Sequence, residues 1–173
     1  LGISVGAGSA ADAVGNLCAA AGPSATFQVD NGKPAVTVSA PSVTQIGTGL
    51  VTFTVTYADP TVNGVASGMN TVTLASGDIT LNAAGNATAG TISVTGTGNT
   101  RTVSLSSITG SGTLGITVNA GSATDTVGNL AAASSASTTF RVDNTSPLLT
   151  IAPSSFSGSI PNGTVSYTVT YTD

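Results

Sequence analysis

The sequence predicts an all-β protein in which two sheets pack against each other as a sandwich. Three observations support this fold class. Apolar and hydroxyl side chains alternate over many short segments, which is the pattern of a half-buried strand. Clusters of Gly, Asn, Asp and Pro, which are turn formers, separate these segments. The chain also repeats itself at a spacing that corresponds to a whole small domain.

The internal repeat defines the expected domain organisation. Residues 1–17 correspond to residues 114–130, and the offset of 113 residues continues as far as Pro34 and Pro147. The offset then becomes 114, so that residues 51–59 correspond to residues 165–173. Solenoid repeats are about 20–50 residues long, so this period is that of a complete domain. We therefore expect three parts, which are the C-terminal part of one repeat, a complete repeat and the N-terminal part of the next: residues 1–33, 34–146 and 147–173.

About eight strands are predicted between Pro34 and Asn144. The clearest is residues 50–57, where Val51, Phe53, Val55 and Tyr57 share one face and threonines occupy the other. The same alternation predicts seven further strands, at residues 36–38, 71–74, 79–81, 91–94, 102–105, 115–118 and 139–142. No segment has the periodic apolar face of an α-helix, so we expect no helix longer than one turn.

This number of short strands in about 110 residues is typical of a two-sheet sandwich with Greek-key connections. Inward side chains from both sheets would form the core, and we expect the following to be buried: Val51, Phe53, Val55, Ile92, Val103, Leu105, Ile116, Val118 and Phe140. With a single Cys18 and no Trp, this would be an immunoglobulin-like sandwich without the disulfide of antibody domains. A β-helix is the structural alternative, but the sequence lacks the period near 20 residues that it requires.

The order and spacing of three motifs resemble the bacterial immunoglobulin-like (BIg) repeats of large surface proteins and adhesins. These motifs are residues 125–129, 140–147 and 165–173, and they recur as residues 12–16, 27–31 and 51–59. The resemblance covers the whole chain. It implies an extracellular stalk built from repeats and often stiffened by calcium, but it does not identify a ligand.

Charge is scarce in this chain. Only 6% of the residues are charged, whereas typical soluble domains have about 25%. The net charge of −4 argues against a nucleic-acid partner, because no basic patch is present to neutralise phosphates. No apolar run approaches the roughly 18 residues of a membrane span, so we expect no membrane insertion in this segment. The expected partners are neighbouring repeats of the same chain, together with homotypic lateral contacts.

Six of the seven aspartates form repeat-equivalent pairs, which are Asp12/Asp125, Asp30/Asp143 and Asp59/Asp173. In an immunoglobulin-like topology, the loop after the second strand, the last loop and the incoming connection lie at one pole. Carboxylate and amide oxygens suit Ca²⁺, whereas the lack of His and of Cys clusters excludes most zinc, copper and iron sites. We therefore expect a Ca²⁺ site at the junction between the first and second copies, formed by Asp30, Asn31, Asp59, Asp125 and Asn129.

A second interpretation of these residues needs no metal. In residues 125–129, Asp closes an Asx turn, Gly supplies a positive φ and Asn tolerates one. This turn chemistry explains Asp125, but it does not explain Asp59 at the same pole. From the sequence, both interpretations remain open.

Catalysis is not expected, because the chain has no His, no Glu and no phosphate-cradling motif. Glycan recognition by stacking would need exposed aromatic rings, and Tyr57, Tyr167 and Tyr171 all fall on inward strand positions. We expect a structural spacer in a large extracellular bacterial surface protein of the adhesin type. The alternative is a segment of an extracellular filament or sheath that self-assembles through sheet edges or strand exchange. The spacer is preferred, because exchange between the two terminal parts would leave a sandwich without the counterpart of residues 60–113.

Overall fold

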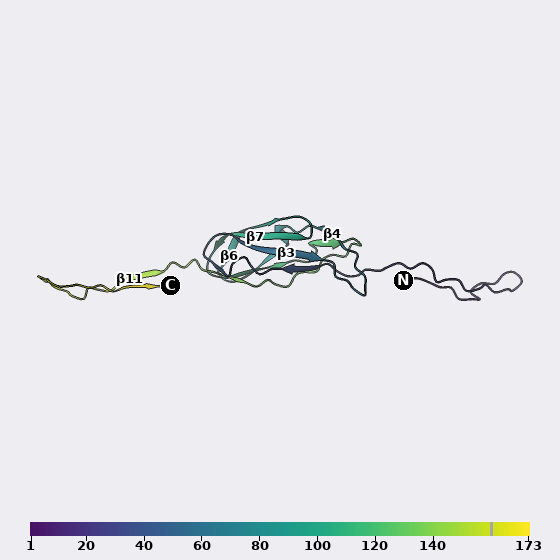
Figure 1. Ribbon diagram of the computed structural model, residues 1–173, viewed down its shortest axis with the longest axis horizontal. Helices are drawn as coiled ribbons and strands as arrows, with labels where there is room; N and C mark the ends of the chain where they lie inside the picture. The colour runs from purple at the N-terminus through teal and green to yellow at the C-terminus, as the bar shows by residue number, and fades with distance from the viewer. Residues whose placement is uncertain (160) are drawn as a thin grey trace.

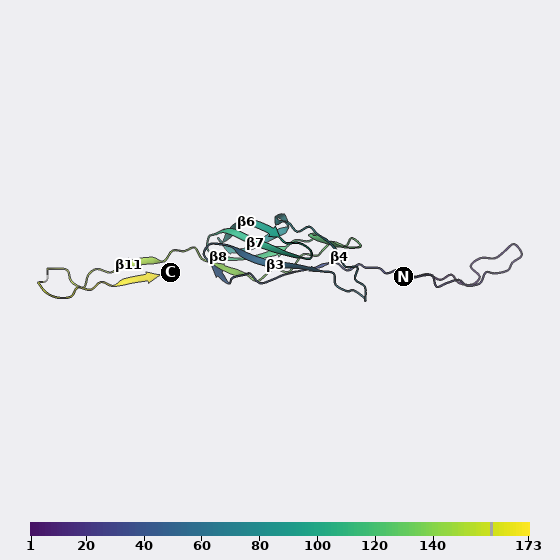
Figure 2. The same cartoon turned by 45° about the horizontal axis from the view of Figure 1, so that its top comes forward.

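The computed structural model describes residues 1–159 and 161–173. Two four-stranded sheets within residues 34–146 share one hydrophobic core, and we call this part the body. Residues 1–33 form an N-terminal arm and residues 147–173 form a C-terminal arm, and the two arms leave the body at opposite ends (Figures 1 and 2). Within the described residues, the helical content is limited to the 3₁₀ turn η1, Ser76–Asp78. None of the described helical segments is long and apolar enough to cross a membrane.

The first sheet has the strand order β1-β3-β7-β6, and all of its pairs are antiparallel. Its strands are β1 (Ala35–Val38), β3 (Val51–Ala58), β6 (Thr88–Thr95) and β7 (Thr100–Thr109). The second sheet has the order β2-β10-β8-β5, in which β2 runs parallel to β10 and the other pairs are antiparallel. Its strands are β2 (Gln45–Ile46), β5 (Ile79–Gly85), β8 (Gly112–Val118) and β10 (Phe140–Val142).

Two small antiparallel ladders complete the fold. One lies at the end of the body near the N-terminal arm and joins β4 (Met69–Val72) to β9 (Ala123–Asp125) (Figure 1). The other lies in the C-terminal arm and joins β11 (Leu148–Ile151) to β12 (Val169–Thr172). The first of these ladders fixes Asp125 at the end of the body.

The core follows directly from the alternation of side chains along the strands. Strand β3 buries every second residue, so that Val51, Phe53 and Val55 are almost completely inaccessible to solvent. The rings of Phe53 from the first sheet and Phe140 from the second are 6.4 Å apart between centroids. The prediction of an all-β protein is therefore confirmed, and the shared core of the two sheets is consistent with a β-sandwich.

The eight predicted strands all correspond to strands in the structure, although one is displaced. The strand predicted at residues 71–74 is β4, which ends at Val72, and Leu74 is buried outside it. Strands β2 and β9 have only two and three residues, which is too short for an alternating pattern to be visible. Of the predicted core residues, Ile92 is only partly buried because it lies on β6, which is an edge strand with a neighbour on one side only.

The outer face of the first sheet is a continuous surface of hydroxyl groups. On β3, β7 and β6 the outward positions pair across the strands, as in Thr54 with Thr102 and Thr102 with Thr95. The hydroxyl face comprises Thr52, Thr54, Thr56, Thr91, Ser93, Thr95, Thr100, Thr102, Ser104 and Ser106. None of these residues carries a charge, so this face is polar without being electrostatically active.

The two arms reproduce the local pairing of the body. In the C-terminal arm Leu149 pairs with Tyr171, and the repeat-equivalent pair in the body is Val36 with Tyr57. The N-terminal arm contains an isolated bridge between Ala11 and Leu17, which matches the bridge between Thr124 and Leu130 in the body. The same local sequence therefore adopts the same local pairing in the arms and in the body.

The arms differ from the body in that, among the residues that the structure describes, no second sheet covers them. Phe27 in the N-terminal arm is 62% exposed, whereas its counterpart Phe140 is 1% exposed. Tyr171 is 73% exposed, whereas its counterpart Tyr57 is 2% exposed. The prediction that Tyr167 and Tyr171 face inward is therefore wrong in this chain, because the inward strand face has no opposing sheet in the arm. The arms thus present core-type side chains to solvent.

The pair Phe140 and Phe27 provides a matched test of the core. Replacing Phe140 with Ala should lower the free energy of unfolding by about 3–5 kcal/mol, because it removes a buried ring from between the two sheets. Replacing Phe27 with Ala should change it by less than about 0.5 kcal/mol, because that ring is largely in solvent. Denaturant unfolding of the two variants measures both values. Equal losses would mean that Phe140 is not part of the stabilising core.

Candidate metal centre

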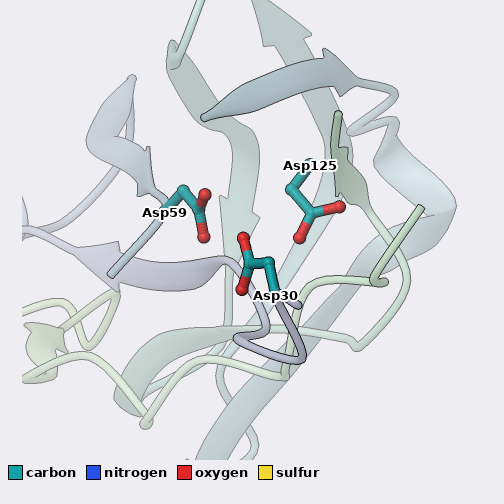
Figure 3. A group of neighbouring side chains, drawn as sticks. All are labelled: Asp30, Asp59 and Asp125. Carbon is teal, nitrogen blue, oxygen red and sulfur yellow. The ribbon is translucent and has the colours of Figure 1, made fainter. Parts of the chain in front are cut away.

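Three carboxylates meet at the end of the body from which the N-terminal arm leaves. Asp30 lies in the connection before β1, Asp59 directly follows β3, and Asp125 is the last residue of β9. Each offers an oxygen atom, and these three oxygens all lie within 4.8 Å of one another. Figure 3 shows the three side chains pointing toward a common space from separate segments of the chain.

The loop between β3 and β4 positions two of these carboxylates. Within it, Val62 and Val65 form a bridge around Asn63 and Gly64, whose φ angles of 52° and 79° are those of a tight hairpin turn. Beyond this turn, two consecutive backbone amides are directed at the carboxylates. The Ser67 amide donates to Asp30 Oδ2 at 2.7 Å, and the Gly68 amide donates to Asp59 Oδ2 at 2.6 Å.

Asp125 is held by a turn within its own motif. Its Oδ1 accepts hydrogen bonds from the amides of Val127 at 3.0 Å and Asn129 at 2.8 Å. The side-chain nitrogen of Asn129 donates to Asp125 Oδ2 at 2.7 Å and to the backbone oxygen of Asp30 at 3.1 Å. Asn129 therefore ties the incoming connection to the last loop of the body.

The equivalent turn in the N-terminal arm shows that this geometry is local. Asp12 Oδ1 accepts from the amides of Val14 at 3.0 Å and Asn16 at 2.9 Å, and Asp12 Oδ2 accepts from the Asn16 side chain at 2.8 Å. Gly15 and Gly128 have φ angles of 93° and 94° in the two copies. In the described part of the chain, no second or third carboxylate joins Asp12 at this turn. Turn chemistry alone therefore accounts for the conformation of Asp125.

Asp59 is different, because turn chemistry leaves one of its oxygens unexplained. Its Oδ2 accepts the Gly68 amide, but its Oδ1 is buried and has no hydrogen-bond partner within the described residues. A buried carboxylate oxygen without a partner is costly, since its hydration is lost and nothing replaces it. This oxygen is the one feature of the cluster that itself points to a missing positive ligand.

The dimensions of the cluster suit a calcium ion. Ca²⁺ holds oxygen ligands at 2.3–2.6 Å, so two of its ligands can be at most about 5 Å apart. A spread of 4.8 Å among the three oxygens falls within this limit. A carboxylate oxygen that accepts one hydrogen bond retains a second lone pair, so the bonds from Ser67, Gly68 and Asn129 do not exclude coordination.

The five residues predicted for the site have different positions in the structure. The structure brings Asp30, Asp59 and Asp125 together. Asn129 contacts two of them, but through its amide nitrogen as a donor, so it holds the site in place. Asn31 is exposed and makes no side-chain hydrogen bond to the three aspartates within the described residues, so it is not placed as a ligand. Sequence reasoning missed Ser67 and Gly68, which act through backbone amides that leave no sequence signal.

The electrostatics of the cluster favour the ionised form of at least two members. Hydrogen bonds from Gly32 and Ser67 lower the pKa of Asp30 below its ordinary value, although burial and the like charge of Asp125 act to raise it. Burial acts to raise the pKa of Asp125, but hydrogen bonds from Asn129 and from the amides of Val127 and Gly128 outweigh it and lower the pKa. In the described part of the chain, the one salt bridge lies elsewhere, so no basic side chain neutralises this cluster.

No family model, no curated protein and no solved structure matches the chain.

The lowered pKa of Asp125 has a consequence for stability. A carboxylate whose pKa is depressed on folding stabilises the fold above its unfolded pKa of about 3.9, and this contribution is lost as the pH falls through the folded value. The free energy of unfolding should therefore decrease from about pH 5 to about pH 2. Replacing Asp125 with Asn should flatten this decrease. The pKa of Asp12 is also lowered by its turn, but Asp12 is exposed in the arm, so replacing it with Asn should flatten the decrease less. Denaturant unfolding across this pH range measures the slopes, and identical slopes in all three proteins would contradict the expectation.

Proposed function

We propose that residues 34–146 form one immunoglobulin-like repeat of a structural spacer in a large extracellular bacterial surface protein of the adhesin type. Calcium at the junction between repeats stiffens this spacer. Three observations support this proposal, which are the resemblance of the repeated motifs to those of BIg repeats, the shared core of the two sheets and the absence of charge from the hydroxyl face. A spacer of this kind needs stable joints more than it needs a reactive centre.

The arms support an arrangement of repeats joined end to end. They leave the body at opposite ends (Figure 1), and they carry the same local pairings as the corresponding parts of the body. On this proposal, residues 1–33 are the last strands of the preceding repeat and residues 147–173 are the first strands of the following one. Their exposed apolar faces would then be covered by the remaining strands of those repeats.

The observation that carries the proposed calcium site is the buried, unpartnered Oδ1 of Asp59 beside two further carboxylates. Asp30 belongs to the connection between repeats, whereas Asp59 and Asp125 belong to the body. A Ca²⁺ ion held by all three would link the connection to two separate loops of the body. Hinge motion at the junction would then require breaking metal–ligand bonds, so the joint becomes stiff.

Calorimetric titration of the chain with CaCl₂ tests this site. We expect a heat of binding and a rise in melting temperature that a chelator reverses, since a ligand that binds only the folded state stabilises it by about 2.7 kcal/mol at a hundredfold excess over Kd. Asp59→Asn should weaken binding, because it removes the charge beside the unpartnered oxygen. Asp12→Asn is the matched control, since Asp12 makes the same turn as Asp125 in the arm.

A titration with neither heat nor a chelator-sensitive melting shift would mean that the aspartates serve only as turn formers. The stiffness of the array would then depend on apolar contacts between neighbouring repeats. An equal loss of binding in Asp12→Asn and Asp59→Asn would place the ion outside the proposed cluster.

The filament alternative has one observation in its favour, which is the set of apolar side chains exposed on both arms. Ile3 and Val5 in one arm and Val169 and Tyr171 in the other are exposed on strand-like segments. Strands with unpaired edges and apolar faces can be completed by a second chain. The two proposals therefore differ in what covers the arms and, because the filament also assembles through sheet edges, in whether the body itself associates with other copies.

Sedimentation of residues 34–146 distinguishes the two proposals. This segment contains the complete core of the body and lacks both arms. The spacer proposal predicts a monomer over the whole concentration range. Polymers that grow with concentration would favour the filament, because they would require contacts made by the body itself.

A further inference from the structure

The two junctions of this chain differ in charge at two equivalent positions, which are Gln28/Arg141 and Lys33/Ser146. Gln28 precedes Asp30 by two residues, and Arg141 precedes Asp143 by two residues, at the same offset of 113. The residues immediately around Gln28 and Arg141 are the same in both copies, with Phe and Val on either side and Asp-Asn after them, and the copies then differ as Gly32-Lys33 and Thr145-Ser146. Two residues before the aspartate, the first junction therefore has a neutral amide where the second has a cation, while the cation of the first junction, Lys33, lies three residues after its aspartate.

Arg141 forms a salt bridge with Asp143, which is the aspartate that corresponds to Asp30. Its guanidinium Nη2 lies 3.1 Å from Asp143 Oδ2, and the remaining oxygen of Asp143 accepts the Thr145 amide at 3.1 Å. Arg141 starts from a fixed position, because it pairs with Gln45 of β2 and Thr113 of β8 in the second sheet. Two residues apart on an extended segment, the two side chains lie on the same face.

The corresponding carboxylate at the first junction has no such partner. The oxygens of Asp30 accept backbone amides from Gly32 and Ser67. Lys33 is the basic residue nearest in sequence, but it is exposed and forms no salt bridge among the described residues. The side chain of Gln28 is exposed and offers no positive charge.

We propose that Arg141 serves as a built-in cation at the second junction, so that this joint depends less on calcium than the first. This inference rests on the proposed calcium site at the first junction. Arg141, Asp143 and Asp173 line one hollow in the surface, and Asp173 is the counterpart of Asp59. The guanidinium is positively charged and pairs with Asp143, which is the counterpart of the proposed ligand Asp30. It both occupies the Asp143 carboxylate and repels a second cation.

The residue two positions before the junction aspartate would thus decide how a joint responds to calcium. A joint with Gln needs the ion to neutralise its carboxylates. A joint with Arg already holds part of the required charge and forms a salt bridge in place of a metal bond. An array that contains both kinds would stiffen unevenly as the calcium concentration rises.

The test transfers the arginine to the first junction of the whole chain. Gln28→Arg should pair with Asp30 and weaken Ca²⁺ binding by about tenfold or more, because the ion must displace a charge-assisted pair before it can bind. Gln28→Leu is the matched control, since it removes the same amide without adding charge. Arg141→Gln is the second control, because it makes a comparable change at the opposite end of the body. Both controls should bind Ca²⁺ at the first junction as the native chain does.

Each outcome of the titration has a definite meaning. If the native chain binds Ca²⁺ and Gln28→Arg binds it equally well, then an arginine at this position does not take the place of calcium. That result overturns the inference about Arg141 and leaves the proposed calcium site unaffected. If Gln28→Leu weakens binding as much as Gln28→Arg, the amide and not the charge is responsible, which also overturns the inference. If the native chain does not bind Ca²⁺, both the calcium site and this inference fail.

Discussion

The contact between the inner faces of the two sheets is the interaction on which the rest of this structure depends. Phe53 and Phe140 meet across the core, and the valines beside Phe53 on β3 are almost completely buried. Because β3 is fixed on both sides by β1 and β7, the residue that follows it, Asp59, emerges at a defined point. The ladder between β4 and β9 places Asp125 at the same end of the body. The polar cluster is therefore positioned by apolar packing some distance away from it.

Much of this arrangement could be predicted from the sequence, because the signals are local. Alternation along a strand reveals which face is buried. Every core residue that it predicted is buried in the structure except Ile92, which is only partly buried. Failure at Ile92 has a simple cause, since alternation does not reveal which strand lies at a sheet edge. The Asx turn at Asp125 was also predictable, because all of its hydrogen bonds lie within five residues and the arm copy forms them independently.

Other properties of the candidate site depend on tertiary packing and could not be predicted in the same way. Strand topology placed Asp30, Asp59 and Asp125 at one pole, but it could not show that Asp59 Oδ1 would be buried without a partner. The amides of Ser67 and Gly68 are equally invisible in the sequence, because every non-proline residue has one. Asn31 was predicted as a ligand because it follows Asp30 in the repeated motif, but it is exposed to solvent. Residue type alone therefore identifies candidate ligands, while loop conformation selects among them.

The hydroxyl face of the first sheet has a consequence for how such an array would respond to its surroundings. Its threonines and serines have no charge to be screened and no proton to lose at moderate pH. Hydration of this face is therefore insensitive to ionic strength and to acidity, whether the surrounding water is fresh or saline. Changes in the medium would act on the molecule only where its few aspartates and arginines gather. A rod built from this body would respond to pH and ionic strength at its joints and would not respond along its hydroxyl face.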